Sequence, residues 1–323
     1  MTTASTPITM SSPLRALRLI AADIKLAHSV FALPFAVLAA FMAAENGPGP
    51  ISGALSGGSR FGGQIGLIVL AMILARTVAM LANRLLDREI DRRNPRTAGR
   101  ALPGGKLGAR AALIVLLTCA VLFMLVCLAF GVLHENWWPT ILGPPILLWL
   151  AVYALFKRFT WLCHLALGSA LAISPLAAAI AVEPATVSPL SPAFQPALWL
   201  LAVMILFWVA GFDVIYALQD REVDIAQNLL SIPARFGFSG ALRASRLMHL
   251  LAAAALIAVA LADPRFGRLF AVGVGIVLAL LIVEHATVAR WGTKRIALAF
   301  FTLNGVISCL VGLLGILDLP AGT

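Results

Sequence analysis

Residues 83–100 read NRLLDREIDRRNPRTAGR and directly follow a strongly apolar run. Within this stretch, Asn83, Asp87 and Asp91 stand four residues apart. Four residues of an α-helix turn through about 400° and rise about 6 Å, so the three side chains share one helix face. Two carboxylates on one face can hold a hard divalent cation through oxygen. A charged cluster at the end of an apolar span is therefore a candidate functional site.

The composition of the chain predicts an all-α polytopic integral membrane protein. Of its 323 residues, 61% are hydrophobic and 12% are charged, and the mean hydropathy is +0.97. A soluble domain is about 45–50% apolar and about 25% charged. The apolar runs are long and lack alternation, which favours helices over barrel strands. The net charge of +10 comes from basic residues between apolar runs, which indicates membrane topology, lipid contact and anionic ligands instead of nucleic acid.

Nine candidate spans of roughly 20 residues follow from the hydropathy pattern. They are centred on residues 24–44, 64–86, 110–133, 139–156, 161–182, 196–217, 242–262, 268–289 and 296–317. Residues 1–14 are polar and are expected to be a disordered tail, so that residues 15–323 form one transmembrane domain. Most Lys and Arg residues fall in alternate loops, which predicts a cell (inner) membrane protein with a cytoplasmic N-terminus and cytoplasmic basic loops. The four cysteines lie in apolar runs without a CxxC pair, so neither a disulfide framework nor a zinc site is expected.

A second acidic stretch echoes the first. Residues 216–224 read YALQDREVD, with Tyr216 four residues before Asp220 and eight before Asp224. A single pair of carboxylates at i and i+4 is readily explained by neutralising arginines at a wet helix end. Two such stretches on the same predicted side favour a function instead. We interpret them as ligands of two Mg²⁺ ions whose coordination is completed by phosphate oxygens and water.

Basic residues accompany the first acidic stretch. Arg92, Arg93, Arg96 and Arg100 follow it, and Asn94-Pro95 is expected to end the helix so that the chain folds back as a loop. Arginine binds phosphate oxygens bidentately, which suits a diphosphate ligand. The alternative is that these arginines serve only membrane topology.

Other polar residues in the apolar runs are fewer. Arg76 lies seven residues before Asn83, on roughly the same helix face, and is expected to point into a cavity. Lys25 and Lys157 stand at span ends, where they can contact either ligand or lipid headgroups. Glu284 is expected near the wet end of its span, and Asn304 is expected to bond another helix.

The two stretches, with the NPRTAGRALPGG and SIPARFG that follow them, resemble the UbiA superfamily of membrane prenyltransferases. KLAHSVFALPFA, RTVAMLANRLLD, YALFKRFTWLCH and GFDVIYALQDREVD resemble its 4-hydroxybenzoate polyprenyltransferase branch. The resemblance implies nine helices around a central cavity that opens sideways to the bilayer and is capped by cytoplasmic loops. It also implies transfer of an isoprenyl group from a diphosphate to an aromatic or other lipophilic acceptor.

The resemblance assigns roles to individual residues. Asp87, Asp91, Asp220 and Asp224 would be the catalytic residues that hold Mg²⁺, and Asn83 and Tyr216 would touch the diphosphate or the metal shell. Lys157, Arg100 and Lys25 fall in segments that bind the phosphates or the aromatic carboxylate. Two positions depart from the branch: Ala101 replaces a usual proline, and Asn228 replaces a usual glycine. Asn tolerates a left-handed backbone, so the loop geometry is expected to survive.

The implied function is Mg²⁺-dependent transfer of a polyprenyl group to the ring carbon ortho to the hydroxyl of 4-hydroxybenzoate, in ubiquinone or menaquinone biosynthesis. The expected partners are a polyprenyl diphosphate, an aromatic acid and the bilayer, with a base or water taking the ring proton. Other acceptors stay open: a naphthoate or another aromatic acid, a tetrapyrrole or a lipid headgroup. A cation-coupled transporter is the alternative from another class, but it would need charged residues at mid-span in several helices, whereas here the acids cluster at one face.

Overall fold

The computed structural model describes residues 31–44, 60–296 and 298–319, with only the backbone described at 298–300. This part of the chain is helical and contains no strand. Eight of its helical segments are long and apolar enough to cross a membrane, and α2 (Leu33–Ala43) is a shorter apolar helix. The expectation of an all-α membrane protein is thus confirmed, with eight candidate spans among the described residues. The tail 1–14, Lys25 and the first part of the predicted span 24–44 lie outside them.

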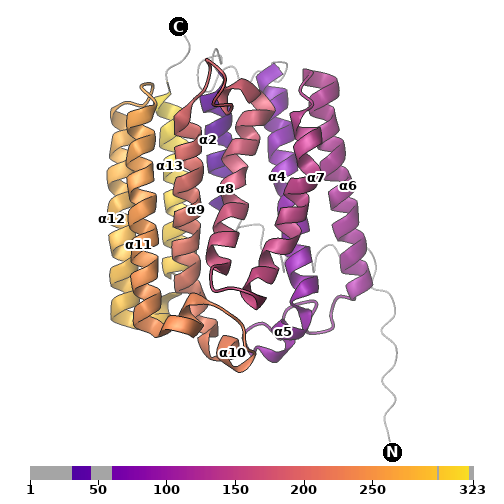
Figure 1. Ribbon diagram of the computed structural model, residues 1–323, viewed down its shortest axis with the longest axis vertical. Coiled ribbons are helices and arrows are strands. Elements are labelled where there is room, and N and C mark those ends of the chain that lie inside the picture. The colour runs from indigo at the N-terminus through magenta and orange to yellow at the C-terminus, as the bar shows by residue number, and fades with distance from the viewer. Residues whose placement is uncertain (1–30, 45–59, 297, 320–323) are drawn as a thin grey trace, which may run out of the picture.

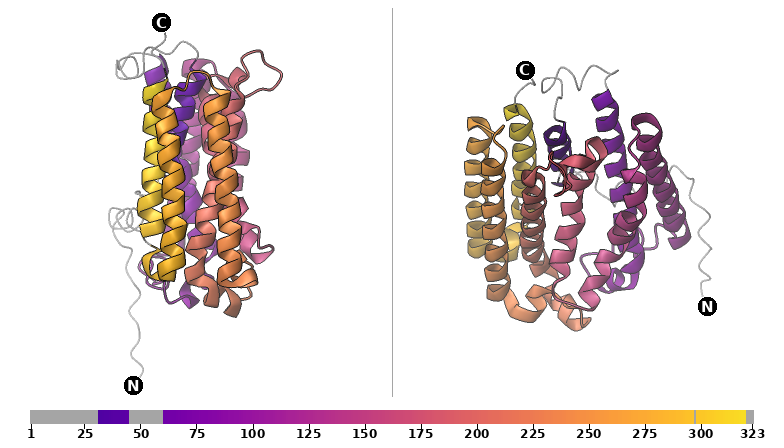
Figure 2. Two further views of the ribbon diagram at one scale, coloured as in Figure 1. Left: turned by 90° about the vertical axis from the view of Figure 1, so that its left-hand side faces the viewer. Right: turned by 45° about the horizontal axis from the view of Figure 1, so that its top comes forward.

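The helices run side by side as one bundle (Figures 1 and 2). The remaining α-helices are α4 (Arg60–Leu86), α5 (Arg88–Arg93), α6 (Ala109–His134), α7 (Trp138–Val152), α8 (Cys163–Val182), α9 (Pro196–Ala217), α10 (Arg221–Ala226), α11 (Ile232–Ala262), α12 (Arg268–Trp291) and α13 (Asn304–Asp318). Shorter 3₁₀ segments are η2 (Tyr153–Arg158), η3 (Pro184–Thr186), η4 (Leu218–Asp220) and η5 (Gly292–Arg295), and η6 (Leu298–Leu303) is a π-helix.

Most predicted spans agree with the observed helices to within a few residues, but one begins much earlier. Helix α11 starts at Ile232, whereas hydropathy places the start at residue 242. Ser231 caps this helix by accepting a hydrogen bond from the Ala234 amide, and a proline stands in its first turn. Gly237 interrupts the helix with a φ of 69°, a left-handed value that glycine adopts without strain. Arg235 and the small residues Gly237, Ser239 and Gly240 lower the hydropathy of these first turns, so a hydropathy window misses them.

Helix α9 lies at the centre of the bundle, between α8 and α11 (Figure 1). Its side chains Leu201, Ile205 and Trp208 are fully buried. Gly168 of α8 lies directly against the α9 backbone, and Gly211 of α9 lies against the His249 ring of α11. Small residues at these crossings allow the helices to approach closely, which is how helices associate in lipid. Helices α4, α6 and α7 form the opposite side of the bundle from α11 and α12 (Figure 2).

A buried polar network crosses α9, α12 and α13. The Trp208 indole N–H donates to Asn304 Oδ1 over 2.8 Å, and Asn304 Nδ2 donates to Glu284 Oε1 over 3.1 Å. The prediction that Asn304 bonds another helix is therefore confirmed. The prediction that Glu284 is wet is wrong, because its exposure is 0% and it lies against Asn304 of α13 and His249 of α11.

Candidate active site

Both acidic stretches break their helices at the first aspartate. Asp87 separates α4 from the short helix α5, with φ −95° and ψ 11°. Asp220 separates η4 from the short helix α10, with φ −100° and ψ 2°. The second aspartate of each stretch lies on the short helix and is buried, with an exposure of 7% for Asp91 and 9% for Asp224. The echo in the sequence is therefore a structural repeat, and both copies lie at the same end of the bundle (Figure 1).

The break does not disperse the polar side chains. The Asp87 amide still donates to the Asn83 carbonyl over 2.9 Å, and the Asp91 amide donates to the Asp87 carbonyl over 2.7 Å. The three side chains consequently line one pocket, as the sequence predicted, together with the second stretch. This charged pocket has a volume of about 230 Å³. Its polar lining comprises Asn83, Arg84, Asp87, Asp91, Asn94, Arg96, Arg100, Tyr153, Lys157, Cys163, His164, Asp213, Tyr216, Asp220, Asp224 and Ser231.

Several bases neutralise the first acidic stretch. Asp87 lies 3.1 Å from both Lys157 Nζ and Arg158 Nη2, at the end of η2. Arg100 Nη1 donates to both carboxylate oxygens of Asp91, at 3.0 and 2.9 Å, and Arg84 Nη1 lies 3.8 Å away. The pairing of Asp87 with Lys157 and of Asp91 with Arg100 brings together residues that the sequence proposed separately.

The second acidic stretch draws its cation from the loop after α5. Arg96 donates to both carboxylate oxygens of Asp220 and, over 3.0 Å, to the Tyr216 hydroxyl. Asn94 Nδ2 donates to Asp220 over 2.8 Å. Burial alone lowers the pKa of Arg96, but its hydrogen bond to Asp220 and the charge of that carboxylate outweigh burial and raise the pKa. Among the described residues, the Asp224 carboxylate accepts one side-chain hydrogen bond, from the Ser231 hydroxyl over 2.8 Å.

The predicted arginines therefore separate into two groups. Arg96 and Arg100 face the pocket, whereas Arg92 and Arg93 are exposed and pair with Glu89 on the outer side of α5. Asn94 ends α5 with an extended backbone before Pro95, as expected. Its Oδ1 accepts the Arg96 amide over 2.9 Å, which turns the chain back over the pocket.

The backbone at Asn228 explains why asparagine can replace glycine there. Its φ is 54°, in the left-handed region that asparagine tolerates. The next amide, of Leu229, donates to the Asp224 carbonyl over 2.8 Å, so the turn closes directly behind the second acidic pair.

A second, apolar cavity of about 370 Å³ adjoins the charged pocket. Seven residues line both: Asn83, Arg84, Arg100, Tyr153, Leu167, Asp213 and Tyr216. Along α4 this cavity extends from Asn83 to Ile68, which is about 22 Å of helix. Its other walls are apolar side chains of α2, α6, α7, α8 and α9.

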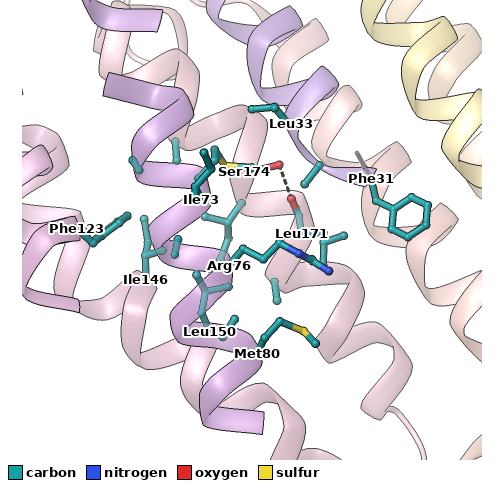
Figure 3. A pocket seen from close by; sticks show the side chains of 18 of the residues that line it. Phe31, Leu33, Ile73, Arg76, Met80, Phe123, Ile146, Leu150, Leu171 and Ser174 are labelled. Atoms are coloured by element: carbon teal, nitrogen blue, oxygen red, sulfur yellow. Dashed lines mark hydrogen bonds between the residues drawn. The ribbon is translucent and has the colours of Figure 1, made fainter. Parts of the chain in front are cut away.

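Arg76 is the deepest base on the wall of the apolar cavity. Figure 3 shows its side chain extending from α4 among apolar neighbours such as Leu150 and Leu171. Its Nε is buried and has no hydrogen-bond partner within the described ranges. A buried arginine nitrogen without an acceptor is costly unless a ligand supplies one. Arg76 thus lies where the sequence placed it, facing a cavity.

Two further residues of the site, Asp213 and His164, had no role predicted from the sequence. Asp213 lines both cavities, and its Oδ2 lies 2.7 Å from His164 Nδ1. An acid within an apolar span is in itself a signal of function, and this signal was available in the sequence. The sequence contains no comparable signal for His164, because its partner Asp213 lies 49 residues away in sequence.

The four aspartates line one pocket but do not form a compact ligand cluster. Within the part of the chain that the structure describes, no three acid, histidine or cysteine side chains gather closely enough to hold a metal ion by themselves. Each of three aspartates faces a base, and Asp224 faces a hydroxyl. Hard oxygen ligands for a divalent cation are therefore present as two pairs, one on each acidic stretch.

These observations define a helical membrane protein that has a charged pocket at one end of an apolar cavity. Comparison with known families specifies it further. Residues 32–306 match the UbiA prenyltransferase family, and the chain belongs to this family. The family resemblance of the two acidic stretches is thereby confirmed.

Two curated relatives are named 4-hydroxybenzoate octaprenyltransferase. The protein from Nitrosomonas europaea is 30% identical over 214 residues, which cover 65% of this chain and 67% of the relative. The protein from Tolumonas auensis is 33% identical over 144 residues, which cover 44% of this chain and 45% of the relative. The chain therefore spans less than half the length of the second protein.

Two solved structures share the fold. The apo structure of a UbiA homologue from Aeropyrum pernix has a TM-score of 0.74 and 29% identity, covering 90% of this chain and 98% of that one. A UbiA homologue from Archaeoglobus fulgidus bound to DMAPP and Mg²⁺ has a TM-score of 0.65 and 20% identity, covering 95% and 99%. At this lower identity the likeness concerns the fold alone.

Proposed function

We propose that this protein transfers a polyprenyl group from a polyprenyl diphosphate to the ring carbon ortho to the hydroxyl of 4-hydroxybenzoate, as a step of quinone biosynthesis. The observation that carries the proposal is the junction of the charged pocket with the apolar cavity. A ligand with an anionic head and a long apolar chain has the same two parts. The name of the relatives from Nitrosomonas europaea and Tolumonas auensis supports the choice of acceptor.

Mg²⁺ fits the charged pocket by the chemistry of its donors. Mg²⁺ is commonly bound by one or two carboxylates and by substrate phosphates, so a preformed cage of three carboxylates is not required. Asp87 and Asp91 would hold one ion, and Asp220 and Asp224 would hold another, with Asn83 and Tyr216 beside them. When bound, the metal supplies positive charge that stabilises a leaving diphosphate. The DMAPP and Mg²⁺ bound to the Archaeoglobus homologue support this assignment.

The bases of the pocket have a second task once a diphosphate enters. Arg96, Arg100 and Lys157 each pair with an aspartate at 3.1 Å or less. These bases would exchange a carboxylate for a phosphate oxygen, which is equally anionic and accepts arginine bidentately. Their fixed positive charges would then favour departure of the diphosphate from the allylic carbon, because they are already oriented toward the leaving group.

Arg76 would bind the acceptor. Its guanidinium lies within the apolar cavity, and among the described residues it forms no ion pair and its Nε has no hydrogen-bond partner. The other bases of the site pair with aspartates: Arg84, Arg96, Arg100 and Lys157. A carboxylate on an aromatic ring would satisfy that nitrogen and remove the cost of a buried charge. The apolar walls around it would keep water from the reacting carbon, so that the allylic group meets the ring first.

The orientation in the membrane completes the proposal. Helices α5 and α10 lie at one end of the bundle (Figure 1), and the basic loops of the chain lie on that side. The positive-inside rule then places the charged pocket at the cytoplasmic face of the inner membrane, where a water-soluble aromatic acid and diphosphate are accessible.

The test is transfer of a labelled prenyl group in membranes that contain the protein. Labelled allylic diphosphate is supplied with 4-hydroxybenzoate, a dihydroxynaphthoate or no acceptor, with and without EDTA. We expect a labelled product with 4-hydroxybenzoate that chelation abolishes and Mg²⁺ restores. Product formed only with the naphthoate would reassign the acceptor. Product unaffected by chelation would reject the metal assignment, and no product with any acceptor would reject the function.

A further inference from the structure

Asp213 is the one carboxylic acid on the wall of the apolar cavity, among the residues that the structure describes. It lies in α9, three residues before Tyr216, so these two residues share roughly one helix face, and Asp220 follows in η4. It also lines the charged pocket. Asp213 therefore stands where the head of a prenyl diphosphate meets its chain, and 22% of its side chain remains exposed there.

The hydrogen bonds of His164 define its tautomer. Its Nε2 accepts the backbone N–H of Ile232 over 3.3 Å. A nitrogen that accepts this bond carries no hydrogen, so the hydrogen of a neutral imidazole lies on Nδ1. Nδ1 then donates to Asp213 Oδ2 over 2.7 Å. His164 is 3% exposed, so this donor is held in place by packing.

This arrangement distinguishes Asp213 from the other acids of the site. Asp87, Asp91 and Asp220 each pair with lysine or arginine through both carboxylate oxygens, so those oxygens are already occupied by cationic donors. Asp224 faces a hydroxyl, but it does not line the apolar cavity. The Nδ1–H of His164 occupies one oxygen of Asp213, and among the described residues no hydrogen bond occupies the other oxygen, which stays available as an acceptor.

We propose that Asp213 is the general base of the reaction and that His164 is its positioning residue. This inference rests on the function proposed above, since aromatic prenylation must release one proton from the ring. From the sequence alone, that proton goes to an unnamed base or to water. Asp213 is the acid at the junction of the two cavities that has a free carboxylate oxygen and a fixed orientation.

The step balances without a redox change. As the allylic C–O bond breaks, its electron pair leaves with the diphosphate. The ring carbon ortho to the hydroxyl supplies two π electrons to the new C–C bond. Asp213 then takes the proton from that carbon, the C–H electron pair restores the aromatic ring, and Asp213 becomes a carboxylic acid. The products are the prenylated aromatic acid, diphosphate and one proton, which Asp213 passes on to water.

The experiment separates departure of the diphosphate from removal of the proton. The full-length protein in membranes receives an allylic diphosphate with ¹⁸O in the bridging position, together with 4-hydroxybenzoate. Scrambling of the label reports reversible ionisation, and product reports the complete reaction. Asp213→Asn preserves shape but cannot take a proton. We expect this variant to scramble the label within about threefold of the unmodified protein and to lose about 10²–10⁴-fold in product formation.

A ring-deuterated acceptor and two His164 variants complete the test. Deuterium at the ring position should slow Asp213→Glu more than the unmodified protein, because a displaced base makes proton removal slower. His164→Gln retains an N–H donor and should keep most activity, whereas His164→Leu should lose about tenfold or more in product with scrambling unchanged.

Four results would overturn the inference. Asp213→Asn that forms product at a near-normal rate would remove Asp213 as the base. Parallel loss of scrambling and product would make its role structural, and equal losses in His164→Gln and His164→Leu would end the positioning role. Absence of both scrambling and product in the unmodified protein would reject the proposed function, and the base with it.

Discussion

The acidic stretches 83–91 and 216–224 have the same backbone design but obtain their countercharges differently. Each breaks its helix at the first aspartate and buries the second. The first stretch is neutralised by η2 and by its own neighbours Arg84 and Arg100. The second has Arg221 beside it, but that side chain donates to the Pro233 carbonyl, and Arg96 of the other half supplies the cation. The two halves are therefore not interchangeable, because the loop after α5 serves both.

Removal of one carboxylate from each half is the strongest test of this comparison. Asp87→Asn and Asp220→Asn should each lose about 10²–10³-fold in kcat. Each variant removes a carboxylate that would hold Mg²⁺, and the Mg²⁺ would stabilise the leaving diphosphate. The matched control is Glu89→Gln, since Glu89 lies on the same short helix but faces outward with Arg92 and Arg93. It should stay within about twofold. Near-normal turnover of both aspartate variants would contradict the proposed site.

A titration with Mg²⁺ should rank the second aspartates. Within the described ranges, the Asp224 carboxylate accepts one side-chain hydrogen bond, from the Ser231 hydroxyl, whereas Asp91 is held by two guanidinium groups. Asp224 is thus more available to a metal ion. Asp224→Asn should raise the Mg²⁺ concentration for half-maximal activity by about tenfold, and by more than Asp91→Asn does. A larger shift for Asp91→Asn would reverse this ranking.

Arg96 should matter more than its neighbour in the sequence. Arg96→Ala removes the cationic donor to Asp220 and to the Tyr216 hydroxyl and leaves Asn94 as a neutral donor to Asp220, so the KM for the diphosphate should rise about tenfold. Arg93→Ala removes a charge of the same sign three residues away that pairs only with exposed Glu89. It should leave KM within about twofold. Equal effects of the two variants would mean that the loop acts through its overall charge.

Arg76 should discriminate the acceptor from the donor. Arg76→Met keeps the length of the side chain but removes its charge, so the KM for 4-hydroxybenzoate should rise about tenfold or more. The KM for the diphosphate should change little, because Arg76 lies in the apolar cavity and outside the charged pocket. Steady-state kinetics with each substrate varied separately measures both values. An equal rise in both KM values would place Arg76 at the diphosphate instead.

The sequence was sufficient to predict the helices, the acidic pairs at one end of the bundle and the cavity-facing Arg76. These features depend on hydropathy and on the spacing of residues within a single helix. It could not predict the contacts between distant segments. The sequence offers four arginines as equal candidates for binding the diphosphate. The structure distinguishes Arg96, which pairs with Asp220, from Arg93, which pairs with Glu89. Glu284 was expected to be wet, since nothing in its own span indicates that Asn304 of α13 bonds it. Such pairings depend on how helices pack, which local patterns do not specify.

The turns that follow the C-terminal ends of α5 and α10 give the smallest expected effect of a substitution. Helix α5 ends in an extended Asn94 before Pro95, whereas the turn after α10 needs the left-handed Asn228, with a φ of 54°. Asn228→Ala should lower the free energy of unfolding by about 1 kcal/mol, because alanine tolerates that backbone poorly. Asn228→Gly should be nearly neutral, since glycine adopts a positive φ readily but loses more entropy on folding. Thermal unfolding in detergent compares the two variants.

Because the Leu229 amide bonds the Asp224 carbonyl, a distorted turn would also shift the second acidic pair, and Asn228→Ala should lower activity slightly while Asn228→Gly does not. Equal stability of both variants would show that the turn after α10 tolerates substitution as well as the turn after α5 does.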